Sequence, residues 1–205
     1  MKKILLSLVG LVVVALVAAA ILPKDFKIEH SVVIAKPKSE VFAYLKLMQN
    51  DKNWSPWIKL DPEMKTELKG NDGEIGAIVS WSGNKEVGSG EQEIVGITEN
   101  ERIDFDLRVK EPTNANNKAY FITEDADEEG KTKVTWGMTG STSFPMNLIC
   151  KLMHGKIQAQ FASGLENLKL VLETPAAEAQ EVSQEPVATE EAAESSEAAS
   201  TPAAE

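Results

Sequence analysis

The stretch FPMNLICKLMHGKIQAQFASGLENLKLVLE, residues 144–173, decides the fold of this chain. Its apolar residues recur every three or four positions, which is the spacing of one face of an α-helix. They are Ile149, Met153, Ile157, Phe161, Leu165, Leu168 and Leu172. A helix of about 28 residues is roughly 40 Å long and needs a broad apolar surface to lie on. A curved antiparallel sheet provides such a surface, and the space between sheet and helix is then a candidate pocket.

Strand patterns dominate the residues before this helix. The clearest strand is 102–110, where Ile103, Phe105, Leu107 and Val109 alternate with charged residues, as on a strand with one buried face. Similar patterns predict strands at 26–35, 64–69, 76–82, 87–98, 118–124 and 131–141, whereas 112–117 is expected to be a polar loop. Two short helical segments are predicted after the first strand, one following Ser39 and one over 50–57. Short turns between consecutive strands indicate an antiparallel meander.

Several short sequence motifs occur along the chain in a characteristic order. They are Ile34-Ala-Lys-Pro37 with Val41-Phe42, Trp54-Ser-Pro-Trp57, Val87-Gly-Ser-Gly90, Asn100-Glu-Arg-Ile103, Val134-Thr-Trp136, and Gly164-Leu165-Glu-Asn-Leu168-Lys169. Through their order and spacing the chain resembles the START-like helix-grip fold of the SRPBCC superfamily, in the polyketide cyclase/dehydrase group, over residues 26–173. The resemblance implies an α+β fold in which about seven antiparallel strands wrap around a long C-terminal helix, with two short helices after the first strand. The family is functionally broad, so the resemblance implies little about chemistry.

The N-terminal segment has the composition of a membrane helix. Lys2 and Lys3 precede a nearly unbroken apolar run, residues 4–22. A helix of that length spans roughly 28 Å, about the hydrocarbon thickness of a bilayer. The run is longer than the usual apolar region of a signal peptide, which favours a retained anchor, although Ala18-Ala19-Ala20 leaves a cleaved signal open. The predicted organisation is therefore an anchor or signal at 1–23, a START-like domain at 24–174 and a tail at 175–205.

The lysines around the apolar run predict its orientation. Lys2 and Lys3 favour a cytoplasmic N-terminus, and the bias is weakened by Lys24 and Lys27 on the other side. We therefore expect a single-pass protein of a bacterial cytoplasmic membrane, with the domain on the periplasmic or other extracytoplasmic side.

Charge is concentrated in the tail. The chain carries a net charge of −11, and the eight glutamates after Glu173, with no lysine or arginine among them, account for −8 of it. The remaining −3 gives no basic footprint, which argues against nucleic-acid binding. The tail is rich in Ala, Glu, Ser and Pro and is predicted to be disordered. It is either a solvating tail or an acidic contact for a basic protein partner.

The sequence contains no motif of a known catalytic, nucleotide or metal site, so no cofactor and no metal is expected, and whether the protein is an enzyme stays open. The candidate ligand-cavity residues are inward-facing aromatic and flexible apolar side chains with one polar group. They are His30, Trp57, Trp81, Phe105, Leu107, Trp136, Met138, Met153, Ile157 and Phe161. Large rings and methionines suit irregular apolar ligands.

Three functions follow as hypotheses. The first is membrane-tethered binding of a hydrophobic small molecule or lipid in the cavity between sheet and helix. The second is a polyketide cyclase/dehydrase-like enzyme, which the family label suggests and which needs a polar group such as His30 in the cavity. The third is an envelope protein-interaction module whose cavity is vestigial.

Overall fold

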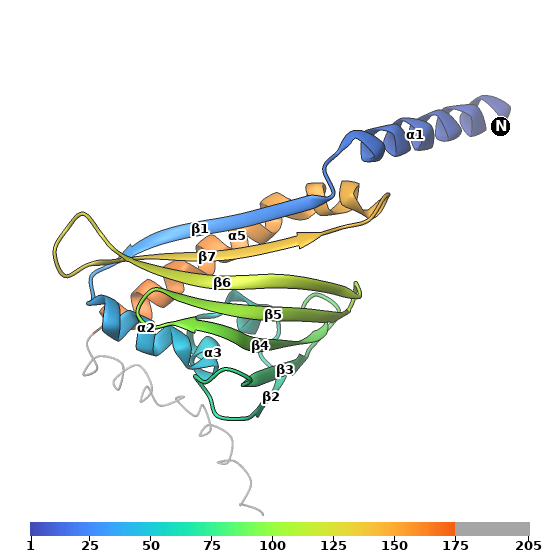
Figure 1. Cartoon of the computed structure of the whole chain (residues 1–205). Coiled ribbons are helices and arrows are strands. Elements are labelled where there is room, and N and C mark those ends of the chain that lie inside the picture. The colour runs from blue at the N-terminus through green and yellow to red at the C-terminus, as the bar shows by residue number, and fades with distance from the viewer. Residues whose placement is uncertain (175–205) are drawn as a thin grey trace, which may run out of the picture. The chain divides into compact units, whose positions relative to one another are not determined.

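The computed structural model describes residues 1–174. The predicted disordered tail at 175–205, with its possible basic partner, lies outside the described residues. The helices are α1 (Lys2–Ile21), α2 (Lys38–Lys46), the 3₁₀ turn η1 (Met48–Asn50), α3 (Asp51–Trp54), α4 (Pro56–Leu60) and α5 (Met146–Glu173). The strands are β1 (Asp25–Ile34), β2 (Lys65–Lys69), β3 (Ile78–Ser82), β4 (Ser89–Thr98), β5 (Arg102–Glu111), β6 (Ala115–Asp125) and β7 (Thr132–Ser141), as Figure 1 shows.

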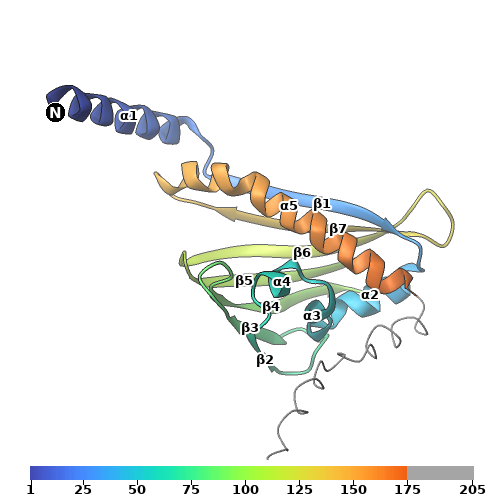
Figure 2. The same ribbon diagram turned by 180° about the vertical axis from the view of Figure 1, so that it is seen from behind.

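The strands form one antiparallel sheet in the order β1-β7-β6-β5-β4-β3-β2. Consecutive strands pair through short turns, except that β1 pairs with the last strand, from Asp25 opposite Ser141 to Ile34 opposite Thr132. Helix α5 lies along β1 and β7 on one face, which we call the inner face, and the short helices lie on the same face (Figure 2). This arrangement is the helix-grip fold, and it confirms the predicted fold class.

Two local predictions were inaccurate. The expected loop at 112–117 is shorter, because β6 already begins at Ala115, which pairs with Val109. Asparagines are typical of loops, but the end of a strand tolerates them when their side chains reach solvent. The second helical segment is split into three pieces, since Pro56 forces Ser55 into an extended conformation between α3 and α4.

The core forms between the C-terminal half of α5 and the inner face of the sheet. Phe161, Leu165, Leu168 and Leu172 are buried there at helical spacing. Gly164 makes this contact close: a Cβ at this position would lie 2.8 Å from the Trp136 ring. The absence of a side chain thus sets how near the helix approaches the sheet.

The N-terminal half of α5 is different. Ile149 and Met153 belong to the same predicted apolar stripe as Phe161, yet both are exposed. Asn147 is the buried residue of this half. The prediction that one stripe packs on the sheet along the whole helix is therefore wrong for its first three turns.

A pair of glycine substitutions in α5 tests the close contact. We expect Gly164→Ala to lower the free energy of unfolding by about 1–3 kcal/mol, because the new methyl group overlaps the Trp136 and Pro56 rings. The matched variant Gly155→Ala meets nothing within 4 Å and is expected to raise it by about 0.5–1 kcal/mol through helix propensity. Urea unfolding followed by tryptophan fluorescence measures both. Equal effects of the two alanines would contradict this packing.

Candidate functional site

A second apolar cluster lies beside the main core, where the N-terminal half of α5 passes over the start of β1. We call it the end cluster. It consists of Ile28, Met138 and Phe161, which are buried, and Phe26, Leu107, Trp136 and Ile157, which are partly buried. Alternation along the strands explains its composition, because every second residue of β1, β5 and β7 faces inward. Four of its seven residues are only partly buried, so the end cluster is less completely covered than the main core.

Trp136 joins the end cluster to the main core. Its ring stacks on Phe161 at 4.2 Å between centroids, with the planes 4° apart. The Trp136 ring also contacts the rings of Trp54 and Phe121, with centroids 5.2 Å and 5.6 Å away. These rings occupy the space between α5 and the middle of the sheet. The Nε1 donor of Trp54 is buried among them with no hydrogen-bond partner in the described chain.

Five of the predicted cavity residues lie together in the end cluster: Leu107, Trp136, Met138, Ile157 and Phe161. Phe105 is placed in the main core instead, fully buried and edge-on to Phe121. That these residues bind a ligand stays a prediction.

The other four predicted residues lie elsewhere. His30 is half-buried and sits opposite Trp136 in the β1–β7 pairing. Trp81 is half-buried and its ring covers Gly90, where a Cβ would lie 2.5 Å away. Trp57 is half-buried on α4, and Met153 is exposed on α5.

Sequence reasoning missed Phe26, Ile28 and Trp54. The first two have the same parity on β1 as His30, so the alternation that selected the histidine was a usable signal for them. Trp54 belongs to one of the short motifs, but a helix this short has too few residues to show which side faces inward.

Two pockets adjoin the end cluster, and Phe26 lines both. The first, which we call the α5 pocket, has a volume of about 210 Å³ and lies between α5 and the chain just after α1. It is lined by residues 22–27, Asn147, Cys150, Lys151 and His154. The second, the sheet pocket, has a volume of about 590 Å³ and is lined by Asp25, Phe26, Asp106, Arg108, residues 116–118, Thr139 and Gly140. Neither is enclosed between α5 and the middle of the sheet, where the rings lie.

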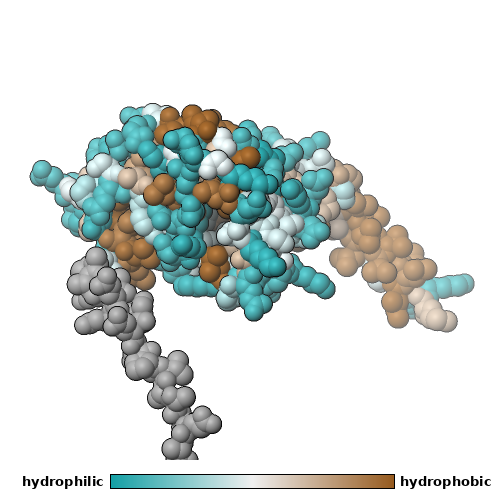
Figure 3. All heavy atoms as spheres, turned by 90° about the horizontal axis from the view of Figure 1, so that it is seen from below, coloured by the Kyte–Doolittle hydropathy of each residue, from teal (hydrophilic) through white to brown (hydrophobic). Residues whose placement is uncertain are grey.

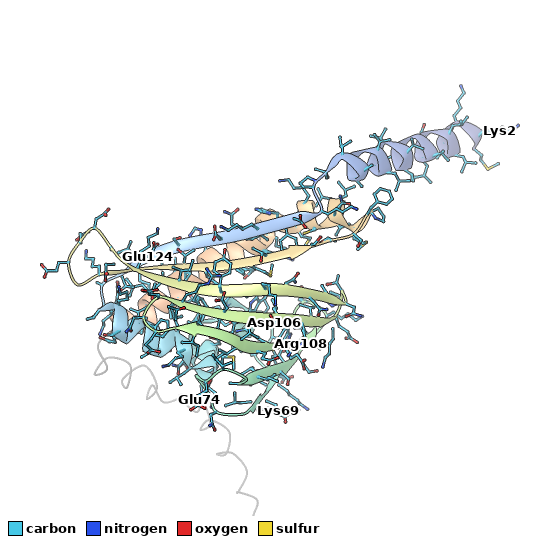
Figure 4. The ribbon with its side chains drawn as sticks, in the orientation of Figure 1. Lys2, Lys69, Glu74, Asp106, Arg108 and Glu124 are labelled. Atoms are coloured by element: carbon cyan, nitrogen blue, oxygen red, sulfur yellow. The ribbon has the colours of Figure 1, made fainter. Side chains whose placement is uncertain are left out.

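The face of the sheet turned away from α5 carries paired charges. Arg108 on β5 bonds Glu91 at 2.6 Å and Glu93 at 2.7 Å, and Figure 4 shows Asp106 and Arg108 side by side on this strand. The bond from Arg108 holds the pKa of Glu91 below its usual range. Tyr120 donates to Glu29, which lowers the pKa of that carboxyl, and burial raises the pKa of the tyrosine. Glu29 and Glu91 are thus engaged in ion pairs that favour the charged form of each carboxyl.

One carboxyl group is held in its neutral form. Loss of hydration raises the pKa of Asp51 to about 8, and the negative charge of Asp72 adds to the effect. Asp72 itself accepts hydrogen bonds from the backbone amides of Met48 at 2.9 Å and Gln49 at 3.1 Å. Among the described residues, no group of three or more His, Cys, Asp or Glu side chains is placed to hold a metal ion.

Solved structures share this fold. The Aha1 dimer from Colwellia psychrerythraea aligns with a TM-score of 0.51 and 17% identity over 72% of this chain and 96% of that one. A protein from Thermobifida fusca aligns at 0.55 with 20% identity, over 70% of this chain and 90% of that one. The protein XoxI from Bacillus cereus aligns at 0.55 with 12% identity, over 73% and 99%.

No protein-family model matches the chain, and no curated protein matches it. At these low identities the structural similarities establish the fold of the domain.

The raised pKa of Asp51 predicts a pH-dependent stability. A carboxyl whose pKa rises from 3.8 in the unfolded chain to about 8 in the folded domain favours folding most below pH 4, and this contribution is lost as the pH rises through about 8. Asp51→Asn is therefore expected to unfold at a higher urea concentration than the parent at pH 8. The free energy of unfolding of the variant is also expected to change less between pH 5 and pH 8 than that of the parent. The matched control is Asp127→Asn, at an exposed position. A parent and an Asp51→Asn variant with the same pH dependence would refute the assignment.

Proposed function

We propose that this domain binds a hydrophobic small molecule or a lipid at the end cluster, while α1 tethers it to a membrane. The observation that carries the proposal is that Phe26, Leu107, Trp136 and Ile157 are only partly buried although they pack against the buried apolar residues of the end cluster. Each CH₂ group of a ligand that covers such a surface contributes roughly 0.8 kcal/mol to binding. An apolar cleft thus holds a ligand without any catalytic group.

Polar groups at the α5 pocket suit the head of an amphipathic ligand. Phe26 belongs both to the end cluster and to the wall of this pocket, so an apolar chain on the cluster leads directly into it. The pocket offers the side chains of Lys24, Lys151 and His154. The Oδ1 atom of Asn147 is a buried acceptor without a partner in the described chain, and it is available to a hydroxyl or amide donor.

Helix α1 supplies the tether in this proposal. It is long and apolar enough to cross a membrane, and nearly all its side chains are exposed. Figure 3 shows α1 brown along most of its length. Its N-terminal lysines favour a cytoplasmic N-terminus, which places the domain outside the cytoplasmic membrane. A tethered domain meets membrane-derived ligands without diffusing through water.

Photo-crosslinking of the full chain tests the binding site. The probe is a sixteen-carbon fatty acid with a diazirine in its chain, added to the protein in lipid nanodiscs and mapped by peptide mass spectrometry. We expect labelled peptides from α1, which contacts lipid, and from the strands and helix of the end cluster. The variant Ile157→Lys puts a charge at a partly buried position of the end cluster, which disfavours binding of the alkyl chain. Labelling of the cluster peptides is therefore expected to fall, while labelling of α1 is retained.

Leu170→Lys is the matched control, because Leu170 is an exposed leucine on the same helix away from the cluster. Absence of label from the peptides of β1, β5 and β7, whatever is found on α1 and α5, would refute ligand binding at the end cluster.

A further inference from the structure

We propose that the chain from Phe144 to Ile157 lies flat on the surface of an anionic lipid bilayer, beside the point where α1 leaves it. The inference rests on the tether of the proposed function and is independent of ligand binding. The segment comprises the first three turns of α5 and the two residues before them.

The first argument is an apolar stripe that the described part of the protein leaves largely uncovered. Met146, Ile149, Leu152 and Met153 are 44%, 50%, 75% and 40% exposed, and Phe144 just before them is 47% exposed. Their spacing of three and four places them on one side of the helix, next to the stripe that continues into the core. A contiguous apolar surface of this kind marks a site of contact with a membrane or another molecule.

The second argument is the position of the stripe. The amide of Asn147, a residue only 3% exposed, donates to the carbonyl oxygens of Ala19 at 2.7 Å and Leu22 at 3.1 Å, at the end of α1. The backbone amide of Thr142 donates to the carbonyl oxygen of Lys24 at 2.9 Å. These bonds hold the start of α5 against the end of the membrane helix. Leu152 lies only about 9 Å farther along the helix axis from Met146.

The third argument is charge. Lys24, Lys151 and Lys156 form no ion pair within the described residues, and α5 has no acidic residue between Met146 and Phe161. Asp25 lines the α5 pocket together with Lys24 and Lys151, and Glu29 pairs with Lys27 at 2.9 Å, so the excess charge near the start of α5 is positive. By helical spacing Lys156 lies on the side of the stripe, whereas Lys151 lies on the side of the α5 pocket. Apolar residues flanked by lysines are typical of helices that lie in a membrane interface. Each lysine near an anionic surface is expected to strengthen the docked state about fivefold.

The same charges disfavour a second copy of the chain as the occupant. A two-fold pairing of this stripe brings like patches together, so the lysines of the two copies would face each other. Anionic lipid headgroups complement them instead.

Fluorescence quenching of the full chain in nanodiscs tests the docking. In a Cys150→Ser background, which removes the native thiol, an environment-sensitive fluorophore is placed at Leu152→Cys. Discs of phosphatidylcholine with one quarter phosphatidylglycerol are compared with discs of phosphatidylcholine alone. In anionic discs we expect quenching by a lipid-borne nitroxide and protection from iodide in the water. Replacing Lys24, Lys151 and Lys156 together by glutamine is expected to lower the ratio of docked to undocked protein, by about fivefold per lysine.

Two further label sites make each outcome decisive. Ser163→Cys lies on the same side of α5, three turns beyond Leu152, and is expected to be quenched by iodide. Val12→Cys, in α1, reports the tether. If iodide quenches the label at residue 152 as strongly as the label at residue 163, while the label at residue 12 stays in lipid, the docking proposal is overturned and the tether remains. Iodide access at residue 12 as well refutes the tether. Protection at residue 152 that persists in detergent and grows with protein concentration means a second copy covers the stripe, which also overturns the proposal.

Discussion

The contact of Phe161, Gly164 and Leu168 with the inner face of the sheet holds this domain together. It brings α5 so close that Trp136 and Pro56 touch the helix backbone at Gly164, and it stacks Trp136 on Phe161. Because only the C-terminal half of α5 packs into the main core, the apolar side chains of its first turns stay exposed. The end cluster, the α5 pocket and the exposed stripe all result from this unequal cover.

The start of β1 is where these features meet. Helix α1 ends at Ile21 and β1 begins at Asp25, so this apolar helix passes almost directly into the sheet. Phe26 is then both a wall of the α5 pocket and a member of the end cluster. If α1 enters a bilayer, as we propose, the end cluster lies a short distance from the lipid surface. In the proposed function the same few residues therefore take part in both binding and tethering.

Much of the fold was predictable from local patterns. Alternation at Ile103, Phe105 and Leu107 identified β5 and its inward face, and the spacing of Phe161, Leu165 and Leu168 identified the packed helix. The spacing of Ile149 and Met153 was equally regular, yet these residues are exposed. A periodic pattern shows that a face is apolar and does not show whether protein or lipid covers it.

The candidate site was harder to predict. Parity placed Leu107, Trp136 and Met138 correctly on the inner face. It does not tell which inward residue is fully buried and which is only partly buried, as Phe105 and Leu107 demonstrate. The pKa of Asp51 depends on burial in the folded domain and on the charge of Asp72, which is distant in sequence, and no local pattern reveals either. The bond from Asn147 to the end of α1 is also a long-range contact of a single polar residue.

The pairing of the first strand with the last has a consequence for biosynthesis. Asp25 pairs with Ser141, so β1 leaves the ribosome long before its partner exists. In the finished domain Ile28, Val32 and Ile34 on β1 are almost entirely buried. During translation this apolar edge has neither β7 nor α5 to cover it, and it follows directly after the most apolar segment of the chain. The domain therefore closes only once nearly all of its residues have been made, and the strand nearest to α1 is the one that waits longest for its neighbours.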